Sequence, residues 1–117
     1  MKSKQAVTVF GAGSWGTAIA KVLAENNWKV NLWAREEQVG DSITNSRDNK
    51  LFLPGTKLTG IINTINSLDD HELFNTNCLI FSSPTQYIRR FLEHIQTDMG
   101  KDIIIINTSK GIDKKPT

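Results

Sequence analysis

The chain lacks several features that whole classes of protein require. Its 117 residues include one cysteine, Cys78, which leaves no partner for an internal disulfide and too few thiolates for a metal site. No apolar run is long enough to cross a membrane, and residues 1–4 are too few for a targeting segment. We therefore expect a reduced, cytoplasmic chain with no membrane insertion, in which the thiol is buried and inert.

The chain also lacks clusters of basic residues and of potential metal ligands. A formal net charge of +2 is spread along the chain, with no basic cluster interleaved with stacking aromatics, so nucleic acid is not an expected partner. His71 and His94 have no neighbours at a metal-ligand spacing, and we expect no metal site. Asp69 and Asp70 are more typical of a helix start than of an acid/base pair.

A glycine-rich turn, residues 11–16, is the most informative feature that the chain does contain. It follows a β-branched, strand-like run at residues 6–10 and precedes apolar residues at helical spacing, namely Trp15, Ala18, Ile19, Val22 and Leu23. In such a turn Gly11 adopts angles that a Cβ would obstruct, Gly13 lets the backbone approach a phosphate, and Gly16 lets helix and strand pack closely.

The place of this turn in the chain decides between two interpretations. A glycine-rich turn by itself is weak evidence, because such turns also occur where no ligand binds. Here the turn opens a helix directly after a strand, where free backbone N–H groups and the helix dipole favour an anion. The sequence therefore predicts that a dinucleotide's pyrophosphate binds at this turn.

Alternating strand and helix signals predict an α/β fold, specifically a Rossmann-type doubly wound parallel sheet. Further strands are expected at residues 28–33, 60–65, 78–81 and 103–106, and helices at Ser14 to about Asn26, from Arg35, at residues 67–74 and after Ser83. Asn26-Asn27 suits a left-handed helix end, and residues 41–49 are too hydrophilic to add much core. The isoleucine run at 103–106 would aggregate at an open edge, so we expect helices or another domain to cover it.

The end of the second expected strand bears on which dinucleotide binds. An acidic side chain there binds the ribose hydroxyls of NAD, whereas an arginine attracts the extra phosphate of NADP. Arg35 follows this strand, and Glu36 and Glu37 come directly after it. We favour NADP, or use of both cofactors, with two alternatives open: an acidic ribose contact that suits NAD, and a solvated Arg35 with no ligand.

Five segments occur in a distinctive order and spacing: Gly11–Ala18, Leu32–Arg35, Asn49–Gly55, Ser83–Gln86 and Ser109–Ile112. Together they resemble the N-terminal part of NAD(P)-dependent glycerol-3-phosphate dehydrogenase over essentially the whole chain. The resemblance implies an enzyme that interconverts dihydroxyacetone phosphate and sn-glycerol 3-phosphate, usually in the reducing direction, for phospholipid synthesis. It also implies that four residues contact the cofactor, namely Ser14, Trp15, Arg35 and Lys110, and that Lys110 contacts the substrate as well.

Lys110 is expected at the site on physical grounds too. It follows the last expected strand, and ligands of open α/β sheets gather beyond the carboxyl ends of strands. An ammonium there suits a substrate oxygen or phosphate, although most lysines are simply solvated. Tyr87 is more typical of core than of a nicotinamide contact, and Phe52 suits either a loop anchor or a cofactor contact. The family more often has valine at Ser83 and tyrosine at Phe52.

The resemblance places the general acid/base, a lysine, in a helical substrate domain beyond this segment. We therefore expect no catalytic residue within residues 1–117, which form a dinucleotide-binding domain incomplete at its C-terminal end. Such a segment would be inactive alone and would belong to a homo-oligomer at full length. The other interpretation is a stand-alone dinucleotide-binding or sensing module.

Overall fold

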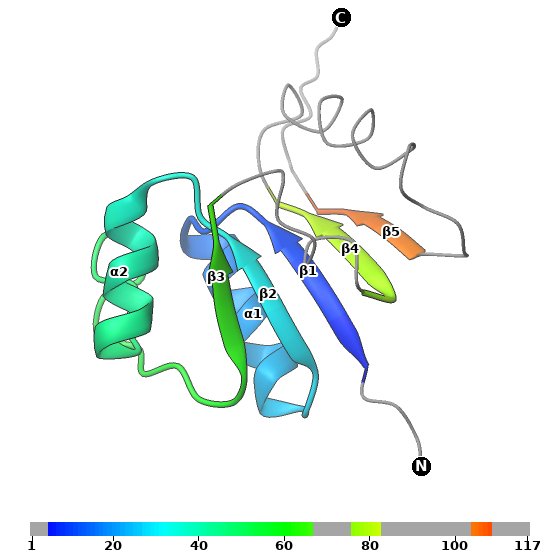
Figure 1. The fold of residues 1–117 in the computed structure, drawn as a ribbon, viewed down its shortest axis with the longest axis horizontal. Coiled ribbons are helices and arrows are strands. Elements are labelled where there is room, and N and C mark those ends of the chain that lie inside the picture. The colour runs from blue at the N-terminus through cyan, green and yellow to red at the C-terminus, as the bar shows by residue number, and fades with distance from the viewer. Residues whose placement is uncertain (1–4, 67–75, 83–103, 109–117) are drawn as a thin grey trace, which may run out of the picture.

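A computed structural model describes residues 5–66, 76–82 and 104–108 of the chain (Figure 1). Within these residues one parallel sheet has the strand order β3-β2-β1-β4-β5. Its strands are β1 Ala6–Phe10, β2 Lys29–Trp33, β3 Ile62–Ile65, β4 Cys78–Phe81 and β5 Ile104–Asn107. The chain winds outward from β1 in both directions, which confirms the predicted Rossmann-type doubly wound sheet. The switch in strand order therefore falls between β1 and β4.

The first helix, α1, spans Ser14–Glu25 and lies behind β1 and β2 in Figure 1. It ends as expected, because Asn27 takes the left-handed conformation at φ 71°. Of the apolar residues at helical spacing, Ile19 and Leu23 pack against the core, whereas Trp15 is 59% exposed and Val22 is 56% exposed. The buried residues of the helix are small, namely Gly16, Thr17, Ala20 and Ala24. Small side chains here let the helix lie close to the sheet.

The second helix, α2, spans Glu37–Ser46 and packs beside β3 (Figure 1). The expectation that residues 41–49 add little to the core is wrong at two positions, since Ile43 and Asn49 are both fully buried. Ile43 reaches the core because it lies one turn beyond Val39 on the same helix face. The polar side chain of Asn49 is buried with its amide group hydrogen-bonded, as the next subsection describes.

The central strands form the core. β4 is buried along its length, and β1 and β2 are buried from their second residue onward, as befits parallel strands covered on both faces. β5 differs, because its three isoleucines are exposed at the edge of the described sheet. The cover that the sequence predicted for this run is therefore not provided by the described residues.

Several sequence predictions lie outside the described residues. These are the helices at 67–74 and after Ser83, together with Tyr87, Lys110, both histidines and the Asp69-Asp70 pair. In the part of the chain that the structure does describe, no helix is long and apolar enough to cross a bilayer.

Candidate functional site

The glycine turn leaves the carboxyl end of β1 and leads directly into α1. Gly11 has φ 119°, a conformation that side chains with a Cβ rarely adopt, and its N–H donates to the Trp33 carbonyl over 3.1 Å. A Cβ on Gly16 would lie 1.8 Å from the Gly11 carbonyl oxygen and 2.6 Å from Ser82 Oγ. Both positions therefore require glycine for backbone reasons, as the sequence predicted.

Gly13 differs from these two positions, because nothing in the described backbone requires glycine there. It is exposed, its φ of −77° suits any residue, and a Cβ built on it would meet nothing within 4 Å. No side chain caps the start of α1 within the described residues, and its first turn carries no acidic residue. The N-terminal N–H groups and the positive end of the helix dipole thus remain suited to an anion.

Ser82, directly after β4, holds the turn from the neighbouring strand. Its hydroxyl lies 3.1 Å from both the Phe10 and the Gly11 carbonyl oxygens, and its N–H donates to Phe10. Beneath this contact the Phe10 and Phe81 rings stack with centroids 4.7 Å apart. The turn is therefore fixed to the strand on the far side of the switch point. Sequence reasoning missed Ser82, because a serine after a strand carries no distinguishing signal.

Asn49 attaches a second segment to the turn. Its Nδ2 donates to the Ala12 carbonyl and to Thr17 Oγ1, each over 2.8 Å, and its Oδ1 accepts from the Phe52 N–H over 3.1 Å. Ser14 Oγ in turn donates to the Phe52 carbonyl. The segment 49–55, which carried much of the family resemblance, is thereby placed against the glycine turn.

Phe52 fits the loop-anchor interpretation through its backbone, which bonds both Asn49 and Ser14. Its side chain is exposed, as is that of Trp15 at the start of α1. Exposed aromatic side chains beside an anion site offer apolar area to a ligand. The structure leaves the cofactor-contact interpretation of Phe52 as a prediction.

Arg35 lies two residues beyond β2, at the same edge of the sheet as the glycine turn. The side chain is 55% exposed, and its Nη2 is 4.0 Å from Glu36 Oε2. An exposed ion pair at this distance holds the guanidinium weakly. Arg35 is therefore positioned by the strand end while its side chain stays accessible to a ligand.

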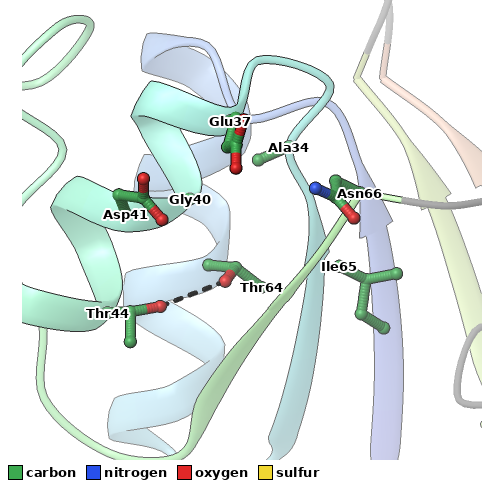
Figure 2. Close-up of a pocket in the computed structure, with 8 residues that line it drawn as sticks. All are labelled: Ala34, Glu37, Gly40, Asp41, Thr44, Thr64, Ile65 and Asn66. Carbon is green, nitrogen blue, oxygen red and sulfur yellow. Dashed lines mark hydrogen bonds between the residues drawn. The ribbon is translucent and has the colours of Figure 1, made fainter.

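A pocket of about 140 Å³ lies between α2 and the carboxyl ends of β2 and β3 (Figure 2). Thr44 and Thr64 share a hydrogen bond of 3.2 Å across it, and Glu37 and Asp41 contribute carboxyl groups to its lining. No residue of the glycine turn lines this pocket. Because two carboxylates repel a phosphate, this pocket does not fit the pyrophosphate.

The described residues contain no group of three or more His, Cys, Asp or Glu side chains that could hold a metal ion. Cys78 is buried in β4, and burial raises the pKa of its thiol, as expected for an unreactive structural cysteine.

Those predicted site residues that the structure describes lie at the same edge of the sheet. Five of them, Gly11, Gly13, Ser14, Trp15 and Gly16, form the turn and the first turn of α1, and Arg35 lies at the neighbouring strand end. Lys110 is outside the described residues, but Thr108 is fixed at this edge by a 2.9 Å bond from its N–H to the Phe81 carbonyl.

A doubly wound parallel sheet with a glycine turn at its switch point defines a Rossmann-type dinucleotide-binding domain. A family model described as the N-terminus of NAD-dependent glycerol-3-phosphate dehydrogenase matches residues 6–117, and the chain belongs to this family. The resemblance noted from the sequence is thereby confirmed.

Curated relatives and solved structures agree with this assignment. The glycerol-3-phosphate dehydrogenase (NAD(P)+) of Moorella thermoacetica is 34% identical over 110 residues, covering 94% of this chain and 32% of the relative. That of Carboxydothermus hydrogenoformans is 37% identical over 108 residues, covering 92% and 32%. The structure of the Saccharomyces cerevisiae glycerol-3-phosphate dehydrogenase superposes with a TM-score of 0.80 at 26% identity, covering 95% of this chain and 35% of that one. The chain thus spans about a third of the length of these relatives.

Proposed function

We propose that this chain is the cofactor-binding part of an NAD(P)-dependent glycerol-3-phosphate dehydrogenase, which interconverts dihydroxyacetone phosphate and sn-glycerol 3-phosphate for phospholipid synthesis. The observation that carries the proposal is the geometry of the glycine turn in a chain that belongs to this family. The turn combines an open face at Gly13 with an uncapped start of α1. These features fit a pyrophosphate.

Each proposed site residue has a stated role. Gly11, Gly13 and Gly16 shape the turn, while the N–H groups of Ser14 and Trp15 face the pyrophosphate at the start of α1. Arg35 binds the ribose phosphate of NADP, and its exposed guanidinium is compatible with use of NAD as well. Lys110 binds the cofactor and the substrate.

The bound nicotinamide supplies the hydride for reduction of the substrate carbonyl. The positive charge of Lys110 stabilises the negative charge that develops on the reacting oxygen. Rigid placement of the cofactor by the glycine turn favours a productive approach of the two reactants. Protonation falls to a lysine of the substrate domain, so residues 1–117 supply binding and orientation rather than the acid/base group.

The proposal is tested on the full-length natural protein. Calorimetry with NADPH and NADH measures cofactor binding, and loss of nicotinamide absorbance with dihydroxyacetone phosphate measures turnover. Residues 1–117 expressed alone are expected to give background turnover, because the group that protonates the carbonyl is absent. Clear reduction by the isolated segment would contradict this division of roles, and a full-length protein that binds neither cofactor would overturn the proposal.

Family membership also leads us to a proposal about assembly and location. We propose a homo-oligomeric cytoplasmic enzyme, which size-exclusion chromatography with light scattering and cell fractionation would test. A stand-alone sensing module is not favoured, because the relatives named above are dehydrogenases.

A further inference from the structure

The peptide unit between Ala12 and Gly13 is held by two buried side chains. The Ala12 carbonyl accepts hydrogen bonds from Asn49 Nδ2 at 2.8 Å and from Thr17 Oγ1 at 3.3 Å. Asn49 and Thr17 are both fully buried. The described chain contains no cis peptide bond, and in a trans unit the N–H points opposite to the carbonyl. The Gly13 N–H is therefore directed away from these buried groups, toward the exposed side of the turn.

The carboxamide of Asn49 suits this task better than another polar group of its size would. It needs a donor toward the Ala12 carbonyl and Thr17, and an acceptor toward the Phe52 N–H. A carboxylate in the same place would direct oxygens at the Ala12 carbonyl oxygen and at the same time carry a buried charge. The contacts thus fix which way the amide lies and, through it, the orientation of the Ala12–Gly13 peptide.

We propose that Asn49 is a positioning residue for phosphate recognition, which aims the Gly13 N–H at the pyrophosphate of the dinucleotide, with Thr17 in support. This inference rests on the proposed function. A glycine-rich turn has more backbone freedom than other turns, and a ligand that must order it binds more weakly. Asn49 and Thr17 remove that freedom before the ligand arrives, although neither side chain touches the ligand.

Ser42 provides a matched control on the same segment. Its hydroxyl donates to the Asp48 carbonyl and accepts from the Lys50 N–H over 3.1 Å, so it anchors the segment beside Asn49. None of its hydrogen bonds reaches the glycine turn. Ser42→Ala therefore loosens the segment, whereas Asn49→Ala loosens the segment and also releases the Ala12 carbonyl.

The experiment measures NADH and NADPH affinity by calorimetry on the full-length protein, at a temperature where circular dichroism shows every variant folded. Asn49→Ala is expected to weaken both cofactors by the same factor, about tenfold, because the pyrophosphate is common to both. Ser42→Ala should stay within about twofold of the wild type. Thr17→Val should weaken binding less than Asn49→Ala, and Thr17→Ser, which keeps the hydroxyl, should restore it.

A second measurement does not depend on the cofactor. With 15N-glycine labelling, the amide signal of Gly13 should shift, and its hydrogen exchange should change, in Asn49→Ala but not in Ser42→Ala. If Asn49→Ala does not fold, the Thr17→Val and Thr17→Ser pair carries the same test. Wild-type affinity in folded Asn49→Ala, or in Thr17→Val where Asn49→Ala fails to fold, would overturn the inference, as would equal weakening by Ser42→Ala. Absence of cofactor binding by the wild type would instead contradict the proposed function.

Discussion

The chain leaves the sheet toward the proposed cofactor site at two neighbouring turns that are built differently. After β1, the backbone of the glycine turn is held by Trp33, Ser82, Asn49 and Thr17 through hydrogen bonds. After β2, Arg35 presents an exposed side chain whose Nη2 lies 4.0 Å from Glu36 Oε2. The first turn suits the pyrophosphate that all dinucleotides share, and the second suits the ribose group in which they differ. In the proposed complex, the fixed backbone of the first turn would serve general affinity, and the exposed side chain at the second would serve the choice of cofactor.

The largest expected effect comes from filling the space under the first turn. Gly16→Ala should destabilise the domain by about 3 kcal/mol or more, since its Cβ would lie 1.8 Å from a backbone oxygen that the sheet holds in place. Urea unfolding followed by circular dichroism measures this change. Gly40→Ala is the control, because its Cβ would meet Thr64 Oγ1 at an ordinary 3.6 Å, and it should be neutral or stabilising. Equal stability of the two variants would contradict the prediction, because it would show that the Gly11 carbonyl can move away from the added Cβ at little cost.

Gly13→Val separates cofactor binding at the first turn from folding, because we expect it to abolish binding and leave the fold intact. The added side chain would project into open space at an ordinary φ, so the unfolding midpoint should change little. In the proposed complex that space belongs to the pyrophosphate, and binding of NADPH and NADH should be lost. Calorimetry on the folded variant checks this, and binding at wild-type strength would place the phosphate site elsewhere.

Arg35→Ala tests the second turn. It should weaken NADPH by about tenfold to a hundredfold, the equivalent of about 1.5–3 kcal/mol for a lost charge-assisted pair, and weaken NADH much less. The measurement is the ratio of the two dissociation constants in the full-length protein. Equal weakening of both would mean that Arg35 contacts a shared part of the cofactor. Glu36→Gln is the companion variant, because a selective loss of NADH would identify Glu36 as the ribose contact.

The smallest expected effect is a pH dependence of folding stability that arises from Cys78, which lies in the core. Burial raises the pKa of Cys78 in the folded state, so on raising the pH the unfolded chain loses this proton first. The contribution of Cys78 to stability is therefore complete below the ordinary thiol pKa of 9.0 and declines as the pH rises above it. Unfolding free energies of wild type and Cys78→Ala should converge from about pH 9 upward. If the difference in unfolding free energy between the two proteins stayed constant above pH 9, the raised pKa of Cys78 would be contradicted.

The strands and the glycine turn could be predicted because their signals are local. A β-branched run such as Ala6–Phe10 indicates a strand wherever it lies, and the order of segments identified the family. The apolar spacing predicted α1 but did not indicate which of its faces is buried: Trp15 and Val22 are exposed, and the buried residues are small. Sequence periodicity does not report how near a helix lies to a sheet.

The supports of the site escaped prediction for a related reason. Asn49 lies in a hydrophilic stretch, and asparagine there is typical of a surface loop; only its partners, Ala12, Thr17 and Phe52, explain its burial. Ser82 likewise matters through carbonyl oxygens that belong to β1 and the glycine turn. Such roles depend on contacts between distant segments, which a single sequence without a structure does not reveal.

The Ser82 contact also has a consequence for the order of assembly during synthesis. β1, the glycine turn and α1 are synthesised close together. The hydrogen bond to the Gly11 carbonyl forms only after Ser82, 71 positions further along the chain, has been added. Contacts between such distant positions form late, since a long loop must close before they are made. A nascent chain that has exposed only its first βαβ unit thus carries the complete glycine motif without its finished geometry. The finished geometry of the glycine turn is consequently expected only after Ser82 has been synthesised.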